Sequence, residues 1–248
     1  MNDKQKVTLL RNSRNAIVAA LQANGFDVNA STRASLFPKY IKWSNGLLDL
    51  CLAANRISDG LKFYFTVEDW ESLSAAQKLG FILRGIRIRA KCQSFVIAPG
   101  SQPQRTWAGA NTNITSVQTR GALYSPQNFE SFTDTIYNTM VNAGSTALAA
   151  EYCKTFKVFS VEGGDAIDDN TRWCLPDIAR LKIVFENYPA INEILSTYWG
   201  SSNVIQKASH WACQQYDASS GYYLTFNTGQ VYFMDKSSSA RILPISNS

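Results

Sequence analysis

The last fifty residues of this 248-residue chain constrain its fold more than any other part. Short runs rich in aromatic and β-branched residues alternate there with turn sequences containing Ser, Asn and Gly. The runs are SHWACQQYD, GYYLTFNTG, QVYFMDK and ARILPIS. This spacing is typical of antiparallel strands joined by tight turns, and it predicts a meander.

Alternation along these runs predicts two different faces. Tyr222, Leu224 and Phe226 share one face, and Tyr223 and Thr225 point the opposite way. We expect the first face to build a core and the second to be displayed. In SHWACQQYD the same rule separates Trp211 and Cys213 from His210 and Ala212. The residues expected in the core are Trp173, Leu175, Leu181, Leu224, Phe226 and Ile242.

The beginning of the chain has the pattern of helices. Residues 5–23 have apolar residues on one face and basic residues on the other, as an amphipathic helix does. A second helix is expected where Leu47, Leu48, Cys51 and Leu52 recur at helical spacing.

Between residues 66 and 99 the sequence contains residues typical of the starts and ends of helices. Thr66 and Ser74 each begin a sequence typical of a helix N-cap, and Gly85 is placed as the residue that ends a helix. Alternating residues 86–90 and then residues 94–99 predict a hairpin.

The middle of the chain is predicted to be an irregular excursion followed by helices. Residues 99–126 are rich in Gly, Ser, Asn, Thr and Gln, and we expect Trp107, Ile114, Val117 and Leu123 to attach them to a core. A helix is expected over residues 128–157 with an interruption at Gly144. Asp177 is expected to cap another helix, which Pro189 breaks.

These elements predict an α+β protein in two regions. Residues 1–95 form a helical region for attachment or oligomerisation that ends in a hairpin, and residues 96–248 form a second domain. The first region has 14 Lys and Arg against 7 Asp and Glu, a net charge of +7, whereas the second has 10 against 12, a net charge of −2. A basic face suits an acidic protein surface, and no nucleic-acid-binding signature accompanies it, so nucleic acid is not expected as a partner.

Few catalytic or metal-binding arrangements are compatible with this composition. His210 is the only histidine, so a catalytic triad or a multi-histidine metal site would depend on that residue alone. The five cysteines form no CxxC pair, and the polar start of the chain does not resemble a signal peptide, so reduced, buried thiols are expected. No apolar run is long enough to cross a membrane, and no membrane insertion is expected. The acidic loop with Glu162, Asp165, Asp168 and Asp169 matches no EF-hand spacing, so we expect a solvated loop and neither metal nor cofactor.

The strings WCLPDIARL, YWGSS, SHWACQQYD, GYYLTFNTGQVYF and ARILPI occur in the order found in a C-type-lectin-like domain. The resemblance covers roughly residues 145–246 and is closest to a branch found in gut Bacteroidetes proteins and their phages. The run FTVEDWESLSAAQKLGFILRGIRIRAKCQSFVIAP is similar to segments of virion proteins of crAss-like phages. The chain departs from the family pattern at Cys174, where Arg is frequent, at Arg180, where Glu is frequent, and at Ala212-Cys213, where Ser-Ser is usual.

The resemblance implies a small antiparallel sheet with two helices in the second domain. It also implies a non-enzymatic virion protein of the tail or head decoration that binds a host-surface glycan or protein. The expected partners are other virion proteins, the host surface and further copies of the chain. Two alternatives are a virion assembly piece such as a ring, collar or plug, and a bacterial surface protein without a virion. An enzyme using Cys174 or Cys213 is a more distant alternative.

Two surfaces are proposed from residue type. Tyrosine, tryptophan and amide side chains provide rigid contact area with adaptable hydrogen bonds, which favours recognition. The residues expected to bind a ligand are Tyr198, Trp199, Gln214, Gln215, Tyr216, Tyr223 and Asn227. The residues expected to bind a virion partner are Lys4, Lys6, Arg11 and Arg14, although a solvated helix face has the same pattern.

Overall fold

The computed structural model describes residues 41–248 apart from 44–45, 100–102, 110, 160–165 and 168–170. The helix expected over residues 5–23 lies outside the described residues. The chain divides into two compact units. One comprises Met1–Leu83 with Arg87–Cys92, and the other comprises Arg84–Ile86 with Gln93–Ser248. Each unit is described by itself.

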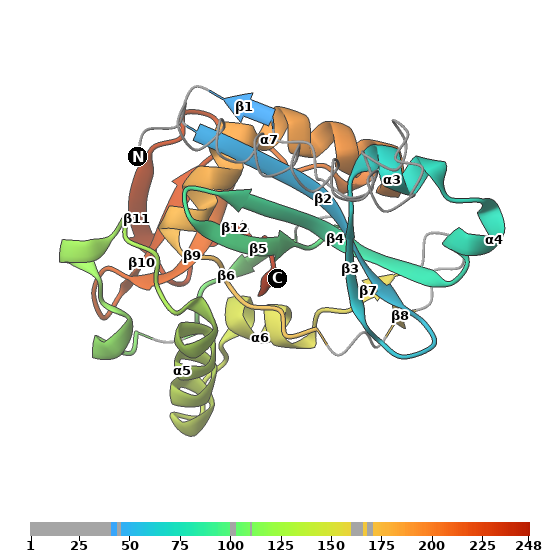
Figure 1. Ribbon diagram of the computed structural model, residues 1–248. Coiled ribbons are helices and arrows are strands. Elements are labelled where there is room, and N and C mark those ends of the chain that lie inside the picture. The colour runs from blue at the N-terminus through green and yellow to red at the C-terminus, as the bar shows by residue number, and fades with distance from the viewer. Residues whose placement is uncertain (1–40, 44–45, 100–102, 110, 160–165, 168–170) are drawn as a thin grey trace. The chain divides into compact units, whose positions relative to one another are not determined.

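The described part of the first unit consists mainly of β-strands (Figure 1). Strands β1 and β3 both pair antiparallel with β2, and β4 also neighbours β2. The strands are β1 (Ile41–Trp43), β2 (Gly46–Arg56), β3 (Lys62–Phe65) and β4 (Phe81–Ala90), and the helices are α3 (Val67–Ser72) and α4 (Ala75–Lys78). Residues Arg84–Ile86 in the middle of β4 are counted with the second unit.

The prediction of a helix around residues 47–52 is wrong, because this segment lies within β2. Every residue from Leu48 to Asn55 is buried, including those that point to opposite faces, so this mostly apolar segment belongs to a strand covered on both sides. Its apolar residues also satisfy helical spacing, which explains the wrong prediction. The segment includes Asp49, whose carboxylate accepts a 3.0 Å hydrogen bond from Arg87 of β4. The Arg87 guanidinium also lies over the Tyr64 ring, 4.3 Å from its centroid. The buried carboxylate is therefore paired.

The two predicted N-caps are confirmed. The Thr66 hydroxyl accepts from the Asp69 N–H at 3.0 Å, and Ser74 and Gln77 form a reciprocal capping box. Gly85, in contrast, ends no helix: it lies inside β4 with φ +155°. The hairpin prediction is confirmed, since β4 and β5 (Gln93–Ile97) are joined by a two-residue turn. Lys91 and Cys92 form this turn with φ of 49° and 61°, values that suit the twist of a hairpin.

A five-stranded sheet is the largest sheet contained wholly in the second unit. Its order is β11-β10-β9-β12-β6, so the predicted meander is confirmed for β9, β10 and β11 (Figure 1). Strand β12 does not continue the meander. It pairs in parallel with β9 and antiparallel with β6. The bounds are β6 (Gln104–Thr106), β9 (Ser209–Gln215), β10 (Ser220–Thr225), β11 (Val231–Asp235) and β12 (Ser239–Arg241).

Two smaller strand pairings complete the second unit. Strand β13 (Ile245–Asn247) pairs antiparallel with β5, so residues 245–247 lie beside residues 95–97. Strands β7 (Val158–Phe159) and β8 (Ala166–Ile167) form a short two-stranded sheet.

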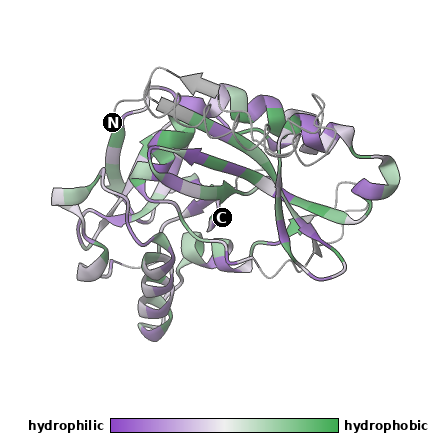
Figure 2. Ribbon diagram, in the orientation of Figure 1, coloured by the Kyte–Doolittle hydropathy of each residue, from purple (hydrophilic) through white to green (hydrophobic). Residues whose placement is uncertain are grey.

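Three α-helices accompany these sheets. Helices α5 (Phe129–Asn142) and α6 (Leu148–Thr155) confirm the prediction of a helix interrupted near Gly144. In Figure 2, α5 carries both hydrophobic and hydrophilic residues, and its buried members include Ile136 and Met140. Asp177 caps α7 (Ile178–Trp199) as expected.

Helix α7 is not broken at Pro189, which lies inside it. Proline removes one main-chain hydrogen bond from a helix interior. Here the helix continues because both halves bury apolar side chains, with Val184 at 1% and Ile191 and Leu195 at 0% exposure.

The predicted fold class is wrong. The described residues are mainly β, with sheets of six, five and two strands and few helices, rather than a helical first region followed by a small sheet with two helices. The predicted core of the second domain is confirmed, because all six residues named for it have at most 1% exposure.

The excursion between β5 and α5 is held to the second unit as expected. Trp107, Ile114 and Val117 are buried, whereas Leu123 is half-buried. Two single 3-10 turns lie within this segment, η1 (Thr115–Val117) and η2 (Arg120–Ala122), and a third, η3 (Ser201–Asn203), follows α7.

Replacing Gly85 by alanine tests the close approach of β4 to β5. An added Cβ would lie 2.0 Å from the carbonyl oxygen of Ile97, which is main chain and cannot rotate away, and φ +155° disfavours any side chain. We expect Gly85→Ala to lower the free energy of unfolding by at least about 2 kcal/mol in urea denaturation. Gly121→Ala is the matched control, since its Cβ meets nothing within 4 Å, and it should be close to neutral. Equal stability of the two variants would contradict this description.

Candidate functional site

An aromatic row crosses one face of the β9–β10–β11 strands. Tyr223 pairs in register with Trp211 of β9 and with Tyr232 of β11, so all three side chains point to the same face. The ring centroids are 6.1 Å apart for Trp211 and Tyr223 and 5.9 Å apart for Tyr223 and Tyr232. Exposure increases along the row from buried Trp211 to Tyr232, which is 47% exposed. We call this face the outer face.

The exposed end of the row carries polar groups beside the rings. The Tyr232 hydroxyl donates to the side-chain oxygen of Gln230, and both Gln230 and Asn227 are exposed in the turn between β10 and β11. The half-buried Thr225 lies on the same face of β10 as Tyr223. Rigid aromatic area with amides and a hydroxyl at its edge is chemically suited to binding rather than to bond making.

The opposite, inner face is packed against α7. His210 and Phe226 have ring centroids 4.5 Å apart, and Phe226 meets Phe185 and Tyr188 of α7 edge to face. Gly229, with φ +70°, has no room for a side chain because a Cβ would lie 2.2 Å from the Phe185 ring. This packing fixes the turn that carries Asn227.

Tyr216 and Phe233 form a second aromatic feature at the rim of the inner face. Their rings stack in parallel with centroids 3.8 Å apart, and Tyr222 packs edge-on against Tyr216. Phe233 remains 49% exposed. The structure thus brings Tyr216 next to Phe233 rather than into the outer aromatic row.

Gln214 and Gln215, two of the expected ligand-binding residues, are fully buried. The Gln214 oxygen accepts from the Ile178 N–H at 2.8 Å, and its amide donates to the Leu123 carbonyl at 3.1 Å. The Gln215 oxygen accepts from the Ile114 N–H at 3.2 Å. In this structure both amides hold neighbouring segments to β9.

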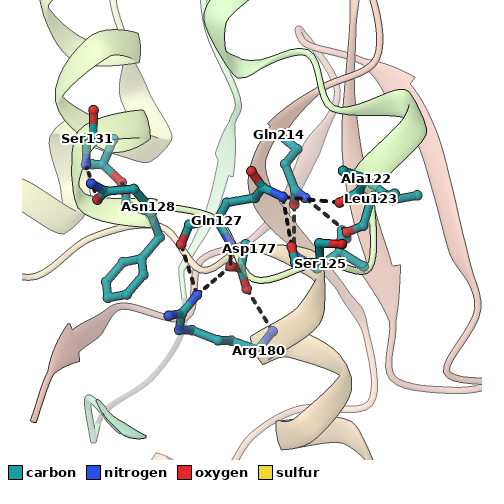
Figure 3. Close-up of polar contacts among 12 residues, drawn as sticks. Ala122, Leu123, Ser125, Gln127, Asn128, Ser131, Asp177, Arg180 and Gln214 are labelled. Atoms are coloured by element: carbon teal, nitrogen blue, oxygen red, sulfur yellow. Dashed lines mark hydrogen bonds and ion pairs between the residues drawn. The ribbon is translucent and has the colours of Figure 1, made fainter. Parts of the chain in front are cut away.

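Figure 3 shows the polar contacts around the start of α7. The Asp177 carboxylate accepts from the N–H groups of Gln127 and Arg180, at 2.7 and 2.8 Å, and from the Arg180 guanidinium. The guanidinium also donates to the Gln127 carbonyl at 3.2 Å and lies over the Phe129 ring. Burial raises the pKa of Asp177, and the Arg180 charge and these donors oppose that rise. The network joins α5 to α7.

A buried lysine, Lys236, also attaches the segment between β5 and α5 to the sheet. The Lys236 ammonium donates to the carbonyls of Thr112 and Ala218 and to the side chain of Gln215, at 2.7, 2.8 and 2.7 Å. It also lies over the Trp107 ring, 4.8 Å from the centroid. Burial lowers the pKa of Lys236 to about 8. The indole of Trp107 in turn rests on Gly221, where an added Cβ would lie 3.1 Å from it.

The remaining predicted residues lie elsewhere. Tyr198 and Trp199 are half-buried at the end of α7, where their rings meet edge to face with centroids 6.2 Å apart. Lys4, Lys6, Arg11 and Arg14 lie outside the described residues, as do Glu162, Asp165, Asp168 and Asp169. The binding roles of these residues stay predictions.

The groups considered for catalysis are enclosed. Cys174 and Cys213 are buried, which raises the pKa of Cys174 to about 11 and also raises the pKa of Cys213 well above its usual value. None of the five cysteines forms a disulfide, and Cys92 is exposed. Within the described ranges, no group of three His, Cys, Asp or Glu side chains is arranged to hold a metal ion.

Sequence reasoning missed three residues that define this region: Tyr232, Phe233 and Lys236. All three lie in QVYFMDK, which the pattern assigned to a strand without distinguishing its exposed positions. Alternation separates two faces but does not indicate that β11 is the outermost strand, where both faces reach solvent. The buried lysine has no sequence signal, because its partners are two main-chain carbonyls and one glutamine.

Comparison with known proteins adds no relative: no family model matches the chain, and no curated protein matches it. None of the helices in the described part of the chain combines the length and the apolar character needed to cross a membrane.

The enclosure of His210 predicts a loss of stability in acid. Burial lowers its pKa from 6.5 to about 4, so between these values the unfolded chain binds a proton that the folded chain excludes. The stability that neutral His210 provides is therefore complete above pH 6.5 and is lost as the pH falls to 4, by up to about 3 kcal/mol. Denaturation from pH 4 to 7 checks this. His210→Phe keeps a ring against Phe226 and should lose this part of the pH dependence, and an unchanged profile would contradict the assignment.

Proposed function

We propose that this chain is a phage virion protein of the tail or head decoration that binds a host-surface glycan or protein through its outer face. The proposal joins the resemblance of residues 145–246 to C-type-lectin-like domains with the position of the aromatic row. The observation that carries it is Tyr232, which is 47% exposed next to Tyr223 on a sheet whose opposite face is packed by α7.

The chemistry of this surface favours a sugar or a polar protein surface as ligand. Aromatic rings offer flat apolar area to the C–H faces of a pyranose, and neighbouring amides offer donors and acceptors to its hydroxyls. Tyr223 and Tyr232 provide the rings, and Gln230 and Asn227 provide the amides. Binding of this kind is non-covalent, and many copies on one particle increase its strength.

The enclosed titratable groups support a binding role without chemistry. His210 is buried and neutral near pH 7, and the thiols of Cys174 and Cys213 are held in the protonated form by burial. Reactive thiols and general bases need an accessible setting and a suitable pKa. We therefore propose a protein that recognises rather than converts its ligand.

The proposal predicts that binding to host cells depends on the two tyrosines. Tyr223→Ser combined with Tyr232→Ser should reduce the binding of labelled full-length protein to intact gut Bacteroidetes cells at least about tenfold, as loss of central aromatic contacts does. Tyr124→Ser is the control, because Tyr124 is 61% exposed but lies outside the aromatic row.

Two results would count against this function. One is undiminished binding by the double variant, and the other is an absence of binding by the unaltered protein to every strain tested. Protection of Tyr232 by neighbouring subunits in an assembled particle would instead favour the alternative, a ring, collar or plug piece whose outer face only contacts other virion proteins.

A further inference from the structure

Strand β11 is the outermost strand of the five-stranded sheet within the described part of the chain, and it lacks the usual protection of a sheet edge. Natural edges are commonly interrupted by a bulge, by proline or by an exposed lysine. The register between β10 and β11 is continuous over five residue pairs, and β11 contains neither proline nor lysine. Lys236, directly after the strand, turns its side chain into the interior.

Every second residue of β11 directs its main-chain N–H and C=O groups away from β10. The Thr225 N–H donates to the Gln230 carbonyl at 3.0 Å, and the Lys236 N–H donates to the Ser219 carbonyl at 2.8 Å. The even-numbered residues therefore face β10, because an antiparallel strand alternates the direction of its main-chain groups. The N–H groups of Val231, Phe233 and Asp235 consequently point away from β10.

The two ends of β11 carry opposite charge. Asp235 ends the strand, and its carboxylate accepts from the Ser237 N–H and hydroxyl at 2.7 and 2.6 Å, which lowers its pKa and keeps it charged. The Asp217 carboxylate is near enough to act on it electrostatically, so two carboxylates at this end outweigh the Lys236 ammonium. At the other end, the Lys182 ammonium donates to the Gly229 carbonyl at 2.6 Å. A second β11 laid antiparallel places each acidic end beside the lysine of the other copy, whereas a parallel strand places like charges together. This complementarity identifies a second copy of the chain as the occupant.

We propose that two copies of this chain pair through β11, antiparallel and related by a two-fold axis at Phe233. Tyr232 of one copy then lies opposite Met234 of the other, and the stacked Tyr216 and Phe233 rings of both copies meet at the axis. The outer faces join into one surface with two aromatic rows. Pairing requires no ligand, so its test is independent of the proposed function.

Sedimentation of the full-length chain tests the pairing. At about 100 μM protein, well above a micromolar dissociation constant, we expect a dimer. Phe233→Lys sets two ammonium groups opposite each other and should weaken dimerisation at least about tenfold. Gln104→Lys adds the same charge to β6 at the other edge of the sheet and should leave the dimer intact. A monomeric wild-type chain, or equal effects of both variants, overturns the proposal.

Cysteine cross-linking tests the register and the orientation. In a Cys92→Ser background, which removes the exposed thiol, Phe233→Cys places two sulfurs across the axis, where opposed Cα atoms are about 5.5 Å apart. In Val231→Cys the two cysteines lie four residues out of register, about 13 Å apart, beyond the roughly 7 Å that a disulfide spans. We expect a disulfide dimer on non-reducing gels for position 233 only. Equal cross-linking at both positions, or none at 233, contradicts the proposed pairing.

Discussion

The hydrogen bonds of two adjacent glutamines on β9, Gln214 and Gln215, hold the segment between β5 and α5 and the start of α7 against the sheet. They thereby determine which part of the sheet stays exposed to solvent. Gln214 joins this strand to the start of α7 and to the Leu123 carbonyl, and Gln215 joins it to Ile114. A buried hydrogen bond contributes about 1 kcal/mol net, but a buried polar group left without a partner costs about 1–3 kcal/mol. Since both amides are fully buried, the excursion has to stay in place for their donors and acceptors to be satisfied.

The location of the exposed aromatic surface follows from this arrangement. The segment between β5 and α5 and the start of α7 pack against β9. At one end of β10, the Trp107 ring also packs on Gly221, and the Lys236 ammonium lies over that ring. The rest of β10 and the outermost strand β11 remain open, so Tyr223 and Tyr232 are supported from below by a packed sheet and reach solvent above. A binding surface built on such a frame loses little conformational entropy when it meets a partner.

The sequence predicted local elements better than their assembly. The caps at Thr66, Ser74 and Asp177 and the three strands of the meander were accessible because short-range chemistry determines them. Leu48 to Asn55 misled the prediction because a strand buried on both sides has no alternation. The glutamines were chosen for recognition by residue type, but their burial depends on Ile114 and Ile178, which lie 101 and 36 residues away. The open edge at β11 depends on strand order, which no local pattern contains.

Hydrogen exchange at the N–H groups of Ile114 and Ile178 tests the central claim most directly, because both donate to the β9 glutamines. The account predicts that these two amides are protected as strongly as the β9–β10 ladder and open only with it. Exchange at the rate of an unprotected loop, while the ladder stays protected, would show that the excursion is not fixed to β9 and would remove the rigid frame on which the aromatic row depends.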